Sequence, residues 1–193
     1  MITALAGGVG AARFLQGLVK VVPKKELTVI VNTGDDIELY DLHISPDLDT
    51  NMYTLAGIVD EEKGWGIRGD TFHCLDMLKK YGHETWFNVG DKDFATHIHR
   101  TQLLKRRFSL SETTKKLCQK LKVDVKVLPM TDDKFETKVV TVNGTMPFQD
   151  YFVKTKAQDE VINVTFEGAE KAQPASGVVD SILSSDAVIV CPS

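Results

Sequence analysis

The chain has 193 residues, of which 42% are hydrophobic and 26% charged, a composition typical of one globular domain with a substantial core. Acidic residues outnumber basic ones by 27 to 23, the formal net charge is −4, and no long basic run occurs. Nonspecific binding to nucleic acid or to a membrane surface is therefore disfavoured. The three cysteines form no CxxC pair and no apolar leader follows Met1, so we expect reduced thiols in a cytoplasmic protein.

The N-terminal residues predict a strand, a helix and a second strand. The segment 2–6 is short, apolar and followed by two glycines, which is typical of a buried parallel strand. Apolar residues at helical spacing over 11–22 predict a helix that Pro23 ends, and the apolar run 27–31 predicts the next strand. This order indicates a right-handed βαβ unit.

Residues 32–50 break this pattern with turn-forming residues and several aspartates. A loop of this length within a compact domain is usually functional or disordered, and its apolar residues favour an ordered loop. A helix is expected over 51–59, with Asp49 or Thr50 available as its N-cap.

The rest of the chain continues the alternation of helices and strands. Ser109 and Glu112 form a capping-box signature, and Asn143-Gly144 predicts a hairpin turn. The expected helices are 71–81, 94–104, 110–121 and 178–183, and the expected strands are 86–89, 123–128, 138–142, 146–153, 161–166 and 187–191. The sequence therefore predicts a single α/β domain over 1–193. It is expected to be Rossmann-like and three-layered, with a mostly parallel sheet and a small antiparallel β excursion, a β-hairpin subdomain around 135–166.

Gly7, Gly8 and Gly10 stand where the first predicted strand meets the first predicted helix. Glycines there allow a ligand to approach the backbone, and the first N–H groups of a helix point toward it, so an anion such as phosphate is the natural occupant. No Gly-Lys-Ser/Thr follows, so this is not a Walker A loop, and Arg13 replaces the third glycine of a dinucleotide fingerprint. Taken alone, the pattern also suits a purely structural tight turn.

Carboxylates gather in the loop that follows the second predicted strand. Asn32, Asp35 and Asp36 come first, and Asp47 and Asp49 follow in the segment SPDLDT. Oxygen ligands at the carboxyl ends of parallel strands are what Mg²⁺ needs beside a pyrophosphate, so Asp35 and Asp49 are predicted metal ligands. The alternatives are a turn role for Asp36 and a helix-cap role for Asp47 or Asp49.

A third glycine turn, Gly90-Asp91-Lys92-Asp93, follows another predicted strand. Lys92 would supply a positive charge for a phosphate or ring oxygen, and Thr96 and His97 add hydrogen-bond donors on the first helical turn. An exposed, salt-bridged turn is the alternative. The histidines lack metal-ligand spacing, which disfavours a zinc site. The three strand-end loops are expected to lie side by side along the carboxyl edge of the sheet, as in a nucleotide site.

The same segments carry a resemblance to a known family. GGVGAARFLQGL at 7–18, VNTGDD at 31–36, ISPDLDT at 44–50 and GDKDFATHIHRTQLL at 90–104 are similar to the motifs of 2-phospho-L-lactate transferase, the CofD family. Further matches, GWGIRGDTF, LPMTDD, FQDYFV and VIVCPS, follow in collinear order. The resemblance therefore covers essentially the whole chain.

The resemblance implies a transferase of deazaflavin coenzyme F-420 synthesis that uses Mg²⁺. Such an enzyme moves a 2-phospholactyl or phosphoenolpyruvyl group from a guanosine diphospho-linked donor to the deazariboflavin Fo and releases GMP. Asp49 and Lys92 match the family's Fo-contacting positions, and Asp49 could also hold Mg²⁺ or, as the catalytic residue, take the hydroxyl proton. The donor's phosphates or ribose would lie at the glycine turn and the end of the second strand, near Gly8, Gly10, Asn32 and Thr33.

The chain departs from the family pattern in two places and in length. Asp41 stands where relatives often have glycine, and Arg107 interrupts a loop that usually contains glycine. Relatives continue past the final CPS, so we expect this chain to be a fragment that lacks part of the guanosine site and the contacts of a homodimer.

Two other functions suit part of the pattern. A related group of CofD-like proteins binds nucleotide sugars and regulates metabolism without transferring a group to Fo, but ISPDLDT followed by MYTLAG favours the transferase. A generic NAD-binding oxidoreductase needs an acidic residue at the end of the second strand to hold ribose, where this chain has Asn32-Thr33.

Overall fold

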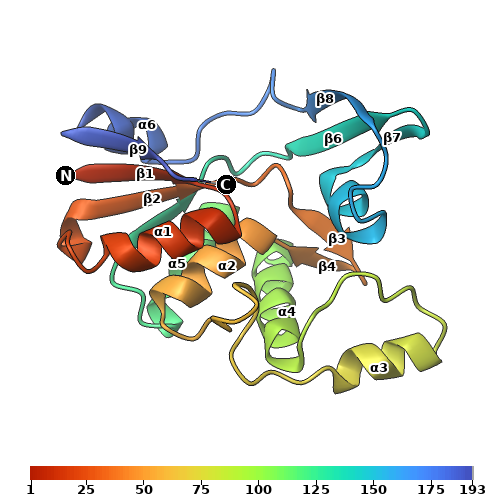
Figure 1. Ribbon diagram of the computed structural model, residues 1–193. Helices are drawn as coiled ribbons and strands as arrows, with labels where there is room; N and C mark the ends of the chain where they lie inside the picture. The colour runs from red at the N-terminus through yellow and green to blue at the C-terminus, as the bar shows by residue number, and fades with distance from the viewer. Residues whose placement is uncertain (193) are drawn as a thin grey trace.

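A four-stranded parallel sheet forms the centre of the fold in this computed structural model, which describes residues 1–192 (Figure 1). The strand order is β5-β2-β1-β9, so the first two strands of the chain lie in the middle and their carboxyl ends, Ala6 and Val31, are paired. The sequence predicts β9 as a buried strand, but it is an edge strand, and Val190 is 78% exposed. The strands of the sheet are β1 (Ile2–Ala6), β2 (Leu27–Val31), β5 (Lys126–Pro129) and β9 (Ala187–Val190).

Helices cover both faces of this sheet and make the three layers that the sequence predicts. One face packs against α1, α2 and α5, with Leu15, Val29 and Met52 buried in the shared core. The opposite face packs against α6, where Ile30 and Val178 are buried. These helices are α1 (Val9–Leu18), α2 (Pro46–Leu55), α5 (Leu110–Lys120) and α6 (Val178–Leu183), and a short 3₁₀ helix, η1 (Lys24–Glu26), precedes β2.

A smaller core lies beside the sheet, where the hairpin β3–β4 packs against α3 and α4. Ile44 and Phe94 are buried in it. The hairpin falls inside 32–50, where the sequence predicts only a loop, because three-residue strands are too short to show a period. Its tip residues Tyr40 and Asp41 have φ of 55° and 57°, the left-handed region that favours glycine. The elements are β3 (Ile37–Leu39), β4 (Leu42–Ile44), α3 (His73–Lys80) and α4 (Asp91–Lys105).

The predicted antiparallel excursion is a three-stranded sheet in the order β7-β6-β8, which Figure 1 shows at the end of the molecule next to β3. Its hairpin turn consists of Val142 and Asn143, one residue earlier than the predicted Asn143-Gly144, and Gly144, at φ 132°, already pairs with Thr141 in the sheet. The second hairpin strand is shorter than the predicted 146–153, because the chain turns into a π-helical segment, η2 (Asp150–Lys154). The strands are β6 (Glu136–Thr141), β7 (Gly144–Pro147) and β8 (Val161–Glu167).

The predicted starts of two helices next to the candidate site are wrong. Helix α2 begins directly after Ser45, so Asp49 lies inside the helix and does not cap it. Helix α4 begins at Asp91, so the predicted turn 90–93 is largely the first turn of the helix. Residues 86–89 form no strand, so the third glycine turn does not follow a strand of the sheet. Only the first two predicted loops therefore lie side by side at the carboxyl edge.

Candidate functional site

Two cavities without a common lining residue lie on opposite sides of the loop that follows β2. The first, about 620 Å³, is lined by Gly7–Gly10, the acidic residues of α2 and an aromatic wall; we call it the glycine-turn cavity. The second, about 560 Å³, lies against β3 and the loop after β5; we call it the hairpin cavity. Asn32 and Asp35 line the first cavity, whereas Thr33 and Asp36 line the second.

The glycine turn is the N-terminus of α1. Gly8 occupies the N-cap position and no side chain caps the helix. The N–H groups of the first helical turn therefore remain available to a ligand. A Cβ atom on Gly8 would lie 2.9 Å from Asp47 Oδ1, so the Asp47 carboxylate lies directly against the turn at Gly8. The turn is open to the glycine-turn cavity along Gly7, Gly8 and Gly10, and the anion site predicted there stays a prediction.

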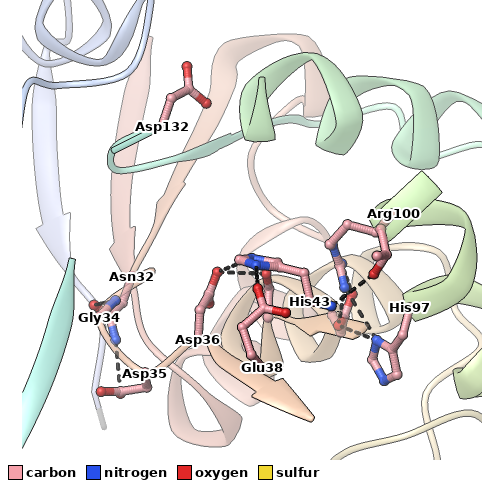
Figure 2. Close-up of polar contacts among 12 residues, drawn as sticks. Asn32, Gly34, Asp35, Asp36, Glu38, His43, His97, Arg100 and Asp132 are labelled. Atoms are coloured by element: carbon pink, nitrogen blue, oxygen red, sulfur yellow. Dashed lines mark hydrogen bonds and ion pairs between the residues drawn. The ribbon is translucent and has the colours of Figure 1, made fainter. Parts of the chain in front are cut away.

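Asp35 and Asp47 are held beside this turn by one amide group. Asn32 Nδ2 donates to Asp35 Oδ2 at 2.9 Å and to Asp47 Oδ2 at 3.0 Å, and Figure 2 shows the Asn32–Asp35 contact. Burial raises the pKa of Asp47 to about 7, and the charges of Asp35 and Asp36 add to this effect. Burial likewise raises the pKa of Asp35. Two carboxylates whose ionisation is costly and which share one weak donor are suited to a cation.

Asp49 is engaged in a buried ion pair. Its two carboxylate oxygens accept from the two terminal nitrogens of Arg100, one of them at 2.9 Å, and the two residues are 4% and 1% exposed. Arg100 also donates to His97 Nδ1 at 3.3 Å, as Figure 2 shows. Because arginine can only donate, this contact makes Nδ1 an acceptor and places the proton of neutral His97 on Nε2. That nitrogen lies 3.4 Å from Asp93 Oδ1.

Three members of this network, Asp93, Arg100 and Tyr53, were not among the predicted site residues. Tyr53 donates to Asp93 Oδ1 at 2.7 Å. Burial would raise the pKa of Asp93, but the contacts with His97 and Tyr53 outweigh burial and lower it. Residues 93, 97 and 100 repeat at i, i+4 and i+7, so a polar stripe on one face of α4 was the available sequence signal.

Asp49, Asp93 and His97 also lie close enough together to hold a metal ion. Asp49 is nevertheless already neutralised by Arg100, so a cation there would have to compete with a buried guanidinium. No Lys or Arg of the described chain is in an ion pair with Asp35 or Asp47. Of the two predicted metal ligands, Asp35 is therefore better placed than Asp49, and Asp47 is its natural partner.

The other predicted binding residues lie outside the cavity lining. Lys92 Nζ donates to the carbonyls of Arg68 at 3.2 Å and Gly69 at 2.9 Å. Asp91 accepts from Thr71 Oγ1 at 2.6 Å and from the N–H of Cys74 at 2.9 Å, which ties it to the start of α3. These hydrogen bonds lower the pKa of Asp91.

Thr96 and Thr33 are the other two predicted binding residues that do not line the glycine-turn cavity. Thr96 lines neither cavity, and the buried Thr33 faces the hairpin cavity and not the glycine turn. Of the predicted residues, the structure thus brings Gly8, Gly10, Asn32, Asp35, Asp49 and His97 to one cavity. The binding roles of Lys92, Asp91, Thr96 and Thr33 stay predictions.

Aromatic side chains make up another part of the lining. Trp65, Phe87, Phe148 and Phe152 belong to it, and the last two rings stack with centroids 5.5 Å apart. The lining residues, all in the described range 1–192, include four aspartates but no Lys or Arg. The lining thus combines the carboxylates beside the glycine turn, which we call its acidic side, with these aromatic rings, which we call its aromatic side.

The fold and the cavity define a Rossmann-like α/β protein with a ligand-sized site at the carboxyl edge of a parallel sheet. The family model described as 2-phospho-L-lactate transferase CofD matches residues 2–193, and the chain belongs to this family. None of the helices described for residues 1–192 has the length and apolar character that crossing a membrane requires.

Relatives in other organisms are similar over the whole chain. A phosphoenolpyruvate transferase of Streptomyces coelicolor is 48% identical over 197 residues, covering 100% of this chain and 62% of the relative. A 2-phospho-L-lactate transferase of Methanocaldococcus jannaschii is 44% identical and is covered to 63%. The chain thus spans about three fifths of the length of these relatives. A crystal structure of a UPF0052 family protein from Bacillus halodurans has a TM-score of 0.63 at 16% identity, covering 99% of this chain and 58% of that one, and shows the fold alone.

Proposed function

We propose that this chain is part of an Mg²⁺-dependent transferase of coenzyme F-420 synthesis. It would contribute the nucleotide site at the carboxyl edge of the parallel sheet. The enzyme would move a 2-phospholactyl or phosphoenolpyruvyl group from a guanosine diphospho-linked donor to Fo and release GMP. The observation that carries the proposal is that one cavity beside the glycine turn is lined both by carboxylates, among them Asp35 and Asp47, and by aromatic rings, among them Trp65 and Phe148. The similarity to a phosphoenolpyruvate transferase and to a 2-phospho-L-lactate transferase supports the reaction class.

The charges of the acidic side support a divalent cation. Asp49 is paired with Arg100, and Asp93 is stabilised by Tyr53 and His97. Asp35 and Asp47 have no Lys or Arg partner among residues 1–192, so the donor's phosphates would meet two carboxylates. Anionic phosphate and carboxylate repel each other unless a cation lies between them. Mg²⁺ bound at this pair would neutralise the phosphates and the charge that develops during transfer.

The aromatic side suits the acceptor. A deazaflavin ring is flat and largely apolar, so it would lie against Trp65, Phe87 or the stacked pair Phe148–Phe152. Its ribityl chain would then extend toward α2, where Asp49 lines the cavity. Lys92 would contact Fo only after leaving the carbonyls of Arg68 and Gly69, and we propose such an exchange as the acceptor enters.

The chemical step forms a bond between the terminal ribityl oxygen of Fo and the phosphorus that carries lactate or enolpyruvate, and breaks the bond from that phosphorus to the phosphate oxygen of GMP. The proton of the attacking hydroxyl would pass to Asp49 and from there to solvent. Such phosphoryl-type transfers depend mainly on positioning and charge neutralisation. Backbone N–H groups at Gly8 and beyond would hold the donor's phosphate oxygens. Asp49, fixed by Arg100, would accept a hydrogen bond from the attacking hydroxyl and orient it.

Binding of Fo to the chain tests the proposal directly. Fluorescence anisotropy of Fo is titrated with the wild-type chain, with Trp65→Ala and with Trp86→Ala, each with GDP and Mg²⁺ present. Trp65 lines the glycine-turn cavity and Trp86 the hairpin cavity, so they form a matched pair. We expect saturable binding that Trp65→Ala weakens by on the order of tenfold, as loss of one stacked aromatic implies, and that Trp86→Ala leaves intact. An equal loss of Fo affinity in both variants, or no Fo binding to the wild type, would contradict an Fo site in this cavity.

Three free thiols support a reducing location. Cys74 is exposed, Cys118 is buried and Cys191 is intermediate, and none pairs with another in the described chain. We propose that the enzyme works in the cytoplasm, and that the assembled enzyme is a homodimer.

A further inference from the structure

Strand β8 is an exposed edge of the antiparallel sheet. Its only strand partner among residues 1–192 is β6, and all seven of its residues are exposed. Figure 1 shows β8 at the margin of the molecule. An edge strand presents a row of unpaired backbone N–H and C=O groups, so β8 can accept a further strand on its outer side.

Proteins usually blunt such edges with short strands, proline or lysine. The other edge strands of the two larger sheets, β5, β7 and β9, have four residues each, and β5 and β7 end in proline. In contrast, β8 has seven residues and contains no proline, lysine or arginine. Its pairing with β6 has one register shift next to Val161 and is regular from Asn163 to Glu167. A regular stretch of edge is therefore left open.

The side chains of this stretch alternate between apolar and polar. Val164 and Phe166 share one face of the sheet and are 42% and 57% exposed. Stacking on Phe135, with ring centroids 6.0 Å apart, holds the ring of Phe166 in place. The other face carries the polar residues Asn163, Thr165 and Glu167. An exposed edge with an apolar row on one face is suited to pairing with another strand.

The same five residues are complementary to themselves. When two identical strands pair in antiparallel fashion, the twofold axis passes through one residue position, because opposed side chains point to the same face. With the axis at Thr165, Val164 of each copy lies opposite Phe166 of the other, and Asn163 lies opposite Glu167. Aromatic and β-branched side chains form favourable cross-strand pairs, and the amide of asparagine can donate to a carboxylate. No like charges are opposed within this stretch, which favours a second copy as the partner.

We propose that β8 pairs with β8 of a second copy around Thr165 and joins the two antiparallel sheets into one. This interface lies within the chain, whereas the sequence predicted dimer contacts beyond it. A stable interface usually buries ~1,200–2,000 Å², more than a short strand pair provides, so this contact alone should form a weak dimer. The inference locates an interface for the proposed homodimer, but it requires neither Fo nor GDP, so the two proposals fail separately.

Sedimentation equilibrium of the whole chain tests the proposal with two matched variants. Thr165→Glu places a carboxylate opposite its own copy at the axis, whereas within one chain residue 165 lies opposite Lys138, which favours a carboxylate. Thr145→Glu is the control, because Thr145 is exposed on β7 at the other edge of the same sheet. We expect a wild-type dissociation constant on the order of 10 µM. Thr165→Glu should weaken dimerisation at least about tenfold, and Thr145→Glu should leave it unchanged.

Disulfide formation tests the position of the axis, and it still decides if Thr165→Glu does not fold. Both cysteine variants carry Cys74→Ser, which removes the exposed native thiol. Thr165→Cys places two thiols directly opposite each other, whereas Val164→Cys separates them diagonally by about 7–8 Å between Cα atoms, beyond the reach of a disulfide. We therefore expect mild oxidation to give a covalent dimer of Thr165→Cys and little of Val164→Cys.

Three results would overturn the proposal. The first is a wild type that stays monomeric at roughly 500 µM, well above the expected dissociation constant, which would leave the edge to another occupant, such as the additional length of the relatives. The second is an equal loss of dimerisation in Thr165→Glu and Thr145→Glu. The third is oxidation that links Val164→Cys as readily as Thr165→Cys.

Discussion

Gly8 passes so close to Asp47 that a Cβ atom at residue 8 would lie 2.9 Å from Asp47 Oδ1. The same construction at Gly7 gives 3.8 Å to Asp47 Oδ2, an ordinary van der Waals distance. The absence of a side chain at residue 8 therefore allows the carboxylate of α2 to reach the N-terminus of α1. This contact brings the predicted anion-binding turn and the pair Asp35 and Asp47 into one site.

Alanine at residue 8 should consequently weaken metal and nucleotide binding. In Gly8→Ala the new methyl displaces the Asp47 carboxylate, so we expect the affinity for Mg²⁺-GDP to fall by ~10- to 100-fold, the range found when groups that orient metal ligands are lost. Gly7→Ala is the matched control and is expected to change the affinity by less than about threefold. Calorimetric titration of GDP in Mg²⁺ gives both values. Equal effects of the two substitutions would contradict the role of this contact.

Removing Arg100 should destabilise the fold strongly. Arg100→Met leaves the buried carboxylate of Asp49 without its counter-charge, so the free energy of unfolding is expected to fall by ~3–5 kcal/mol. The double variant Asp49→Leu/Arg100→Met removes both charges and is expected to recover most of that loss. Urea unfolding of the two variants and the wild type measures the difference. If the double variant is no more stable than Arg100→Met, the pair is not the source of the effect.

Glycine at residue 107 should stabilise the protein. Arg107 follows the C-cap of α4 with φ 67°, and its N–H donates to the Leu104 carbonyl at 2.8 Å, as in a helix end that favours glycine. Arg107→Gly relieves left-handed strain of ~1–2 kcal/mol at a cost in chain entropy of ~0.5–1 kcal/mol. A net gain of roughly 0.5–1 kcal/mol is expected in urea unfolding. Arg106→Gly, at φ −85°, is the control and should destabilise.

Local signals in the sequence were sufficient for much of the fold. The apolar runs of β1 and β2 and the helix at Val178–Leu183 agree with the predicted bounds to the residue. Because β1 and β2 are parallel neighbours, the glycine turn and the aspartate loop had to meet, as they do.

Other features depend on contacts between distant residues. Asp49 and Arg100 are 51 residues apart, and no local pattern indicates that they pair. Thr33 was expected beside Asn32 in the donor site, but successive residues of an extended segment point to opposite sides, and Thr33 faces the other cavity. Lys92 and Asp91 stay predicted ligand contacts, but no local pattern indicated the hydrogen bonds that they make to Gly69 and to the start of α3.

The raised pKa of Asp47 predicts how stability and metal binding depend on pH. Its folded-state pKa is about 7, against an ordinary value of 3.8, so between these values the folded protein binds a proton that the unfolded chain does not. Without metal, stability should therefore fall as pH rises from about 4 to about 7, and then level off. Mg²⁺ requires the ionised carboxylate, so its affinity should rise over the same interval with release of a proton.

Thermal unfolding from pH 5 to 8, with and without Mg²⁺, checks this dependence. Asp47→Asn is expected to flatten the metal-free profile and to raise the melting temperature at pH 8, because it removes a buried charge next to Asp35. The raised pKa of Asp47 would be contradicted if the metal-free melting temperature of the wild type rose between pH 5 and 7 and Asp47→Asn showed the same pH dependence.

We propose that Asp35 and Asp47, and not the cluster of Asp49, Asp93 and His97, hold the divalent cation. Electron paramagnetic resonance of free Mn²⁺, titrated into the wild type, Asp47→Asn and Asp93→Asn at pH 8, measures this most directly. We expect one bound Mn²⁺ in the wild type, unchanged Mn²⁺ binding in Asp93→Asn, and at least tenfold weaker Mn²⁺ binding in Asp47→Asn, about the loss expected for a missing carboxylate ligand. Retention in Asp47→Asn together with loss in Asp93→Asn would contradict it and place the metal beside Arg100.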